Sequence, residues 1–410
     1  MRASSERSAG GGPQRPARRV PTRAPAWHDG RMASRTAGEP ILSVRALNRA
    51  TLERQHLLRR TTMAVPDLLE SLVGLQAQTP HTAYVGLWTR LEDFRPEALS
   101  DRLVDRSVVR LALMRGTIHL VTARDAWDLR PLVQPVLARA WKSQFGRRLE
   151  GVDPAEVVAL GRAFVDREPR TFRALGDHLL SRWPDRDRAA LEQTVRAGVP
   201  LIQVPPRGLW GRSGPVAHTS IEAWLGEPPA GPPPTLDDLV RRYLGAFGPA
   251  SVMDAQAWCG LTKLGEVFER LRPRLATFRD ERGRELFDLP EAPRPDPETP
   301  APVRFLYDFE NLLLSYANRS RALPPGTERD PEARTQESLN TFTVDGFVRG
   351  TWRMDRIREG VILNVTPKRA LSGSETAAVA HEADGLLRFL AVDASVRDFR
   401  VLPPRPGPEL

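Results

Sequence analysis

The chain has 410 residues, of which 40% are hydrophobic, enough for about two to four domains with their own cores. No apolar run approaches the roughly 18 residues needed to span a membrane. The single cysteine, Cys259, excludes an internal disulfide and a cysteine-based zinc site. These features predict a soluble protein in a reducing, cytoplasmic compartment.

The net charge of +9 is concentrated near the N-terminus, because residues 1–36 carry eight arginines and only two acidic side chains. This composition, rich in Gly and Pro, predicts a disordered basic arm over residues 1–42 and no secretory signal. Either the arm is genuine and adds non-specific attraction to a polyanion such as DNA, or translation starts at Met32. Only three lysines are present, so few amines could form a Schiff base.

Residues 43–124 read as the first of three similar units, each made of short helices followed by a β-hairpin. Helical patterns end in the alternating run "VVRLALMRGTIHLVT", which predicts two strands around a turn. In this run Arg115, Thr117 and His119 would share one face of a strand. They would either line a cleft or, in the case of His119, form part of the core.

Residues 125–224 and 225–289 repeat the order of helices and hairpin. The second unit ends in "PLIQVPPRGLWGRSG", where Pro206-Arg207-Gly208 signals a turn. Arg207, Trp210 and Arg212 on this hairpin would either grip phosphates or decorate an ordinary exposed wing. The third unit follows a Pro-rich linker at 225–235 and ends in "LATFRDERGRELFDLP". Helices with a hairpin wing form a winged helix, whose usual partner is duplex DNA.

Residues 303–402 follow a second Pro-rich linker, 290–302, and predict a mainly-β, barrel-like domain. Strand patterns in "TFTVDGFVRGTWRM" and "GVILNVTP" precede a single helix, "SETAAVAHEADGLLRFLAV". Residues 403–410 read as a frayed tail. The expected fold class is therefore α+β, with three tandem winged-helix units and a C-terminal β domain.

Gln76 and Gln78 flank Ala77 in an otherwise apolar run. On a helix such positions are about 200° apart, whereas in an extended chain they lie on one face. Pro80 disfavours helical geometry at Thr79, so the preceding helix should end near here. The two amides either bond backbone groups at the end of that helix or act together in a site.

Five segments carry a family resemblance: "GLQAQTPHTAYVGLWTRL", "LMRGTIHLVTARDAW", "AFGPASVMDAQAWCGL", "VRFLYDFENLLLSYANRSR" and "TVDGFVRGTWR". They resemble the AlkZ/YcaQ family of winged-helix DNA glycosylases, from about residue 43 to 400. The resemblance implies three winged helices curved around DNA and a C-terminal β-barrel. It also implies removal of bulky or cross-linking alkyl adducts, which in antibiotic producers protects the host from its own genotoxin.

The family's catalytic motif is Gln, an apolar residue, then Gln, and Gln76-Ala77-Gln78 matches it. The sequence departs from the family at Glu310, where Asp is expected, and at Tyr316-Ala317-Asn318-Arg319, where His-Ala-Asp-Arg is expected. No role is assigned to these positions.

The resulting hypothesis is a monofunctional DNA glycosylase that hydrolyses the N-glycosidic bond of N7-alkylguanine-type purines. Such a purine is already positively charged and leaves without an acid, so the amide oxygens of Gln76 and Gln78 need only place the attacking water. The side chains expected to bind DNA are Arg115, Thr117, His119, Arg207, Trp210 and Arg212.

The expected partner is duplex DNA containing alkylated purines, bound by a monomer associated with the nucleoid and not with a membrane. No cofactor is expected, and no metal, because the seven histidines lack paired ligand spacing. The alternatives are a non-catalytic winged-helix regulator and a drug-sequestering protein. Regulators usually have one winged helix and a dimerisation helix, and a sequestering protein would bind its drug without DNA.

Overall fold

The structure, a computed structural model, describes residues 39–324 and 339–404. Most of the basic arm, including Met32, and the end of the C-terminal tail lie outside the described residues. From Glu39 onward the chain forms one compact unit of helices and three sheets. In the described ranges no helix is both long and apolar enough to cross a membrane.

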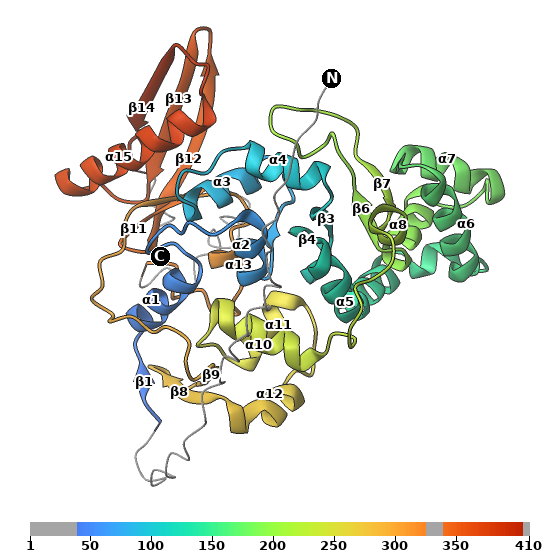
Figure 1. Ribbon diagram of the computed structural model, residues 1–410, viewed down its shortest axis with the longest axis horizontal. Coiled ribbons are helices and arrows are strands. Elements are labelled where there is room, and N and C mark those ends of the chain that lie inside the picture. The colour runs from blue at the N-terminus through green and yellow to red at the C-terminus, as the bar shows by residue number, and fades with distance from the viewer. Residues whose placement is uncertain (1–38, 325–338, 405–410) are drawn as a thin grey trace, which may run out of the picture. The chain divides into compact units, whose positions relative to one another are not determined.

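Helices from the three expected units appear in chain order (Figure 1). In the first unit these are α1 (Val44–Arg54), α2 (Val65–Ser71), α3 (Thr82–Arg90) and α4 (Glu97–Val104). In the second they are α5 (Ala123–Gln144), α6 (Pro154–Arg167), α7 (Phe172–Arg182), α8 (Arg188–Gly198) and α9 (Ile221–Leu225). The third contributes α10 (Leu236–Phe247), α11 (Val252–Cys259) and α12 (Gly265–Leu271), and the C-terminal region α13 (Asn311–Leu314) and α15 (Gly373–Leu390).

The hairpins of the first two units share one six-stranded sheet, with the order β2-β4-β3-β6-β7-β5. Its strands are β2 (Leu75–Gln76), β3 (Val108–Ala112), β4 (Ile118–Thr122), β5 (Arg170–Thr171), β6 (Leu201–Gln203) and β7 (Ala217–Ser220). The two hairpins join because β3 pairs antiparallel with β6, with Arg110 opposite Gln203. They are therefore neighbours in one sheet and not separate wings.

The second hairpin differs from its sequence pattern. The turn at Pro206-Arg207-Gly208 is present, and Gly208 has a φ of 94°. However, the returning strand β7 begins only at Ala217, so Arg207, Trp210 and Arg212 lie in a long loop. The "GRSGP" stretch cannot serve as the returning strand because its Gly and Pro residues weaken strand pairing.

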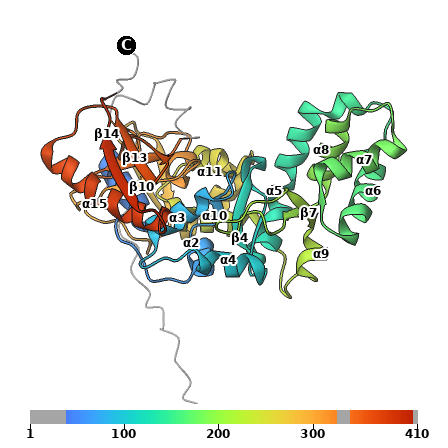
Figure 2. The same ribbon diagram turned by 90° about the horizontal axis from the view of Figure 1, so that it is seen from above.

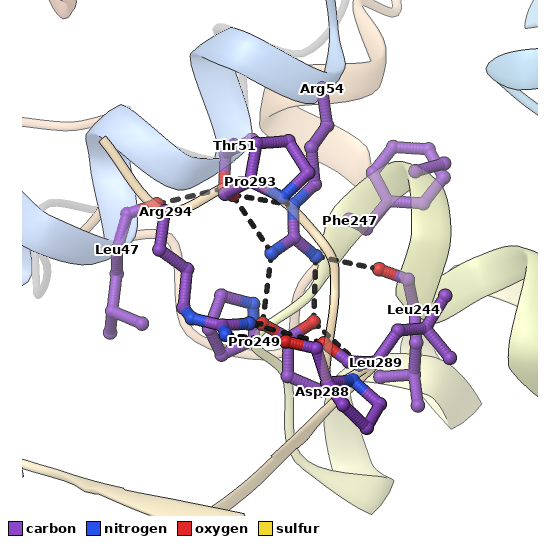
Figure 3. Close-up of polar contacts among 12 residues, drawn as sticks. Leu47, Thr51, Arg54, Leu244, Phe247, Pro249, Asp288, Leu289, Pro293 and Arg294 are labelled. Carbon is purple, nitrogen blue, oxygen red and sulfur yellow. Dashed lines mark hydrogen bonds and ion pairs between the residues drawn. The ribbon is translucent and has the colours of Figure 1, made fainter. Parts of the chain in front are cut away.

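The third hairpin is confirmed: β8 (Ala276–Asp280) pairs antiparallel with β9 (Glu285–Asp288). β1 (Ile41–Leu42) adds to it in parallel. A buried ion pair connects the hairpin to the start of the fold (Figure 3), where the Arg54 guanidinium on α1 donates to both carboxylate oxygens of Asp288, at 2.7 and 2.8 Å. Arg54 also donates to the Leu244 carbonyl at the end of α10, so the first helix is fixed to the third unit.

The C-terminal sheet is open, so the expectation of a barrel-like domain was wrong. Its order is β10-β11-β12-β13-β14, and β10 does not pair with β14. The strands are β10 (Arg304–Leu306), β11 (Thr341–Val344), β12 (Phe347–Ile357), β13 (Gly360–Pro367) and β14 (Val396–Val401). Helices pack where further strands would be needed to close the sheet into a barrel. β10 packs against α3 and α15, and α15 lies along β13 and β14 (Figure 2).

The chain reverses direction just before the two glutamines. Helix α2 ends at Ser71, earlier than the end near Thr79 expected from Pro80, and Val73 and Gly74 have positive φ angles of 54° and 87°. The reversal lets β2 run antiparallel to β4, with Gln76 opposite His119. A Cβ on Gly74 would lie 2.6 Å from Cγ1 of Val121, so only glycine allows this close approach.

We expect Gly74→Ala to lower the free energy of unfolding by about 1–3 kcal/mol, because it adds a clash and a strained φ. Urea denaturation measures this change. Gly265→Ala is the matched control, since a Cβ on Gly265 at the start of α12 meets nothing within 4 Å. If both variants unfold at the same urea concentration, the reversal before the glutamines does not require glycine.

Candidate active site

The segment of Gln76 and Gln78 is attached along β4 by a ladder of hydrogen bonds. The backbone N–H of Ala77 donates to the Ile118 carbonyl at 2.8 Å, and the backbone N–H of Ile118 donates to Oε1 of Gln78 at 3.2 Å. Gln76 is buried and its Oε1 accepts from Nη2 of Arg115 at 2.6 Å, whereas Gln78 is exposed. Because both oxygens face N–H donors, the orientation of each amide is defined.

Arg115 lies in the turn of the first hairpin and not on a strand. It occupies a 3₁₀ turn, Met114–Gly116, with a φ of 55°. From there its guanidinium bridges two parts of the fold, because Nη2 donates to Gln76 and Nη1 to the carbonyl of Trp258 in α11. The arginine therefore connects the glutamine segment to the third helical unit.

The expected polar row of Arg115, Thr117 and His119 on one strand face was wrong. Two consecutive positive φ angles, at Arg115 and Gly116, break the alternation, so only His119 belongs to β4. Thr117 is half-buried after the turn and its hydroxyl donates to the Met114 carbonyl at 3.0 Å. The three side chains therefore cannot act as one row.

His119 is a buried, neutral imidazole. It is 2% exposed, and its Nδ1 lies 2.9 Å from the Thr117 carbonyl, which can only accept, so Nδ1 carries the hydrogen. Burial lowers the pKa of His119 to about 3, and the charge of Arg115 acts in the same direction. This environment favours the core alternative for His119.

Arg110 on β3 was not among the predicted site residues, and it also holds the glutamine segment. Its guanidinium is 2% exposed and donates through Nη2 to the Ala77 carbonyl at 2.7 Å. Its Nε and Nη1 are buried and have no hydrogen-bond partner among the described residues. Burial lowers the pKa of Arg110 to about 10, and the nearby charge of Arg207 adds to this. The signal was present in the sequence as one charged residue within an apolar strand.

The long loop between β6 and β7 is fixed to the first unit. The Tyr84 hydroxyl donates to the Gly208 carbonyl at 2.8 Å, and the Trp210 ring packs 4.9 Å from that of Tyr84 and 5.3 Å from that of Phe389. Trp210 therefore anchors the loop. Arg207 is half-buried and donates to the Gly214 carbonyl at 3.3 Å, while Arg212 is exposed.

A metal site is not formed by the described residues: among 39–324 and 339–404, no three His, Cys, Asp or Glu side chains gather closely enough to hold an ion. The arginines around the glutamine segment can donate hydrogen bonds to a substrate but do not coordinate a cation.

A family model described as "DNA glycosylase AlkZ-like" matches residues 69–389, which include the glutamine segment, all of the six-stranded sheet and the third hairpin. The chain belongs to the AlkZ-like DNA glycosylase family. The resemblance read from the sequence is thereby confirmed, and the chain is placed among hydrolases that cleave N-glycosyl bonds.

A curated relative of this AlkZ-like chain is an interstrand DNA cross-link repair glycosylase from Streptomyces sahachiroi. It is 26% identical over 325 residues, covering 74% of this chain and 85% of the relative. The solved structure of Streptomyces sahachiroi DNA glycosylase AlkZ matches with a TM-score of 0.67 and 20% identity, over 88% of this chain and 100% of that one. The structural likeness shows a shared mixed α+β fold.

Of the departures from the family pattern in this AlkZ-like chain, Glu310 and Tyr316 are buried and Asn318 is half-buried. Glu310 forms a fully buried ion pair with Arg90 of α3, and the Tyr316 hydroxyl donates to the Phe247 carbonyl at 2.8 Å. The Asn318 side chain accepts from the backbone N–H of Ser320 at 2.9 Å. These positions hold the C-terminal region against the helices, and none of these hydrogen bonds involves a glutamine of the motif.

We expect Arg115→Met to slow base excision by up to about 100-fold, since Gln76 loses the donor that orients its amide. The measurement is a single-turnover rate at saturating protein, with DNA affinity determined in parallel. Arg212→Met, in the exposed part of the loop, serves as control and should weaken binding and its salt dependence without changing the rate. An Arg115→Met protein with reduced affinity and an unchanged rate would assign Arg115 to DNA binding alone.

His119 should make unfolding pH-dependent. Its folded pKa of about 3 lies below its ordinary value of 6.5, so its contribution to stability is complete above pH 6.5 and is lost as the pH falls towards 3. When the pH falls from 7 to 5, we expect the wild-type protein to lose up to about 2 kcal/mol more unfolding free energy than the His119→Gln variant loses. Denaturant titrations at both pH values measure the slope. Part of the dependence of unfolding free energy on pH should remain in this variant, because burial also lowers the pKa of His218 to about 4. If His119→Gln leaves this pH dependence unchanged, the burial of His119 as a neutral group is contradicted.

Proposed function

We propose that this chain is a monofunctional glycosylase that hydrolyses the N-glycosidic bond of bulky or cross-linking alkylated purines of the N7-alkylguanine type. The observation that carries the proposal is the pair of glutamine amides fixed on β4, one by Arg115 and one by the Ile118 backbone. Such rigidly held dipoles stabilise a transition state without having to reorganise during the reaction.

The chemistry fits a leaving group that is already charged. An N7-alkylguanine is a cation in DNA, so its C1′–N9 bond breaks without protonation and the purine departs neutral. Each glutamine oxygen accepts one N–H donor and keeps a second lone pair, which can hold the attacking water near C1′. Neither amide carries a net charge that would oppose the approach of phosphates.

The proposed partner is duplex DNA containing such purines, bound by a monomer in the nucleoid region of the cytoplasm. We interpret the three groups of helices with their hairpins as winged-helix units that present this DNA surface. Arg115 and Thr117, at the turn beside the glutamine segment, would face the cleft around the lesion, whereas the buried His119 would support the segment from the core. Arg207 and Arg212 would contact phosphates from the loop that Trp210 anchors.

The proposed biological role is base-excision repair and self-resistance to a genotoxic natural product. The support is the relative from Streptomyces sahachiroi, whose name assigns it repair of interstrand DNA cross-links. Expression of this chain in a sensitive bacterium should raise survival under a DNA-alkylating natural product, and the Gln76→Ala, Gln78→Ala double variant should not.

Membership of the glycosylase family disfavours the two alternatives, a regulator and a drug-sequestering protein. A sequestering protein would bind the free drug equally well in the presence and absence of DNA. A regulator would bind a particular sequence of undamaged DNA and release no base.

The direct test incubates the purified protein with duplex DNA carrying one N7-alkylguanine, and we expect free base and abasic sites in equal amounts. Replacing Gln76 or Gln78 by Ala should slow single-turnover excision about 10- to 1,000-fold, as expected for loss of one preorganised polar group. Borohydride should trap no covalent protein–DNA species, because water is the nucleophile.

Melting temperatures of the same variants separate catalysis from folding. A catalytic role predicts a slower rate with little change in stability, most clearly for the exposed Gln78. A purely structural role predicts a loss of about 1–3 kcal/mol of stability with normal excision by the folded protein. Gln78→Asp should retain activity if this position handles water. Normal excision by the double alanine variant would show that the two glutamines take no part in catalysis.

A further inference from the structure

Asp308, from a distant part of the sequence, lies next to the glutamine segment. It follows β10, and its Oδ2 accepts a hydrogen bond of 2.6 Å from the hydroxyl of Thr79. Thr79 is exposed and comes directly after Gln78 in the chain. The carboxylate therefore lies at the boundary between the protein interior and the exposed end of the motif. A second contact fixes this arrangement, because the Asn311 side chain donates to the Gly74 carbonyl at 3.0 Å.

The other oxygen of this carboxylate is unsatisfied. Asp308 is 9% exposed, and among the described residues its Oδ1 has no hydrogen-bond partner. A buried carboxylate oxygen without a donor is unfavourable and needs an explanation, of which a catalytic role is one. The neighbouring residues show the same pattern: the buried Tyr307 hydroxyl has no partner within the described ranges, and Phe309 has a strained φ of 57°.

Hydrolysis of a cationic purine releases a proton that the glutamines cannot take. Water forms a bond to C1′ while the C1′–N9 bond breaks, and the bonding electrons neutralise the charge of the purine. The water must then lose a proton, and a carboxamide does not accept one at neutral pH. His119, opposite Gln76 in the sheet, is buried with its Nδ1 hydrogen directed at the Thr117 carbonyl.

We propose that Asp308 is the proton acceptor for the attacking water. This inference rests on the proposed function. The water is held by the glutamine amides and transfers its proton to Oδ1 of Asp308, while the Thr79 hydroxyl holds Oδ2 and so orients the carboxylate. After the base has left, the proton passes to solvent. The negative charge of Asp308 also stabilises the positive charge that develops at C1′.

Asp308→Asn tests this role, because it keeps the shape and an oxygen for Thr79 but removes the basic group. The substrate is duplex DNA with a single N7-methylguanine, and the readouts are the single-turnover rate constant at saturation, the protein concentration at half-saturation and the melting temperature. We expect the rate constant to fall about 100-fold or more. The half-saturation concentration should stay within twofold, and the melting temperature should not fall.

Two variants serve as controls. Asp288→Asn makes the same change in a buried aspartate that pairs with Arg54 (Figure 3), and it should lower the melting temperature while the folded protein retains the wild-type rate constant. Thr79→Val removes only the orienting hydroxyl and should slow excision less than Asp308→Asn.

The outcomes separate this role from the proposed function. A wild-type rate constant in Asp308→Asn, with active wild-type protein and slow glutamine variants, would overturn the role of Asp308 alone. A lower rate constant explained entirely by weaker DNA binding would overturn it as well. If the wild-type protein releases no base, the proposed function fails, and the assignment of Asp308 fails with it.

Discussion

The arrangement of the site depends on the Arg115 guanidinium, which contacts two segments that are far apart in sequence. It donates to Gln76 on one side and to the last turn of α11 on the other, through the Trp258 carbonyl. Gly260, directly after α11, has a φ of 82°, which favours glycine, and a Cβ there would lie 3.0 Å from Cγ1 of Val136. A helix of the third unit thus determines the orientation of a side chain in the first.

Several unsatisfied polar atoms lie around the glutamine segment. Arg110 donates to the Ala77 carbonyl but leaves two buried nitrogens without partners, and Asp308 accepts from Thr79 but leaves one buried oxygen without a donor. Other unsatisfied atoms lie elsewhere among the described residues, such as Nε of Arg90, although its guanidinium pairs with Glu310. What distinguishes the unsatisfied atoms of Arg110 and Asp308 is their position beside the glutamine motif.

Local patterns in the sequence predicted much of the fold, because helices and hairpins depend on residues close together in the chain. The position of Arg115 was mispredicted because alternation does not reveal two left-handed residues in a row. The shared sheet, the open C-terminal sheet and the contact of Asp308 with Thr79 depend on pairings across long separations, 229 residues in the last case. Spacing within a motif carries no information about such partners, so the sequence indicated the two glutamines but not Asp308, and it marked Arg110 only as one charged residue within an apolar strand.

The groups around Gln76 and Gln78 also bear on which bases the site can release. A neutral purine or pyrimidine needs a proton as it leaves, and the imidazole opposite Gln76 cannot supply one, because burial lowers its pKa to about 3. Arg115 holds its protons too strongly to act as an acid at neutral pH. What these groups can do is orient water and accept its proton. Under the proposed function, a site of this composition favours a base that is already cationic, and selectivity for alkylated purines would follow from that requirement without tight recognition of the adduct.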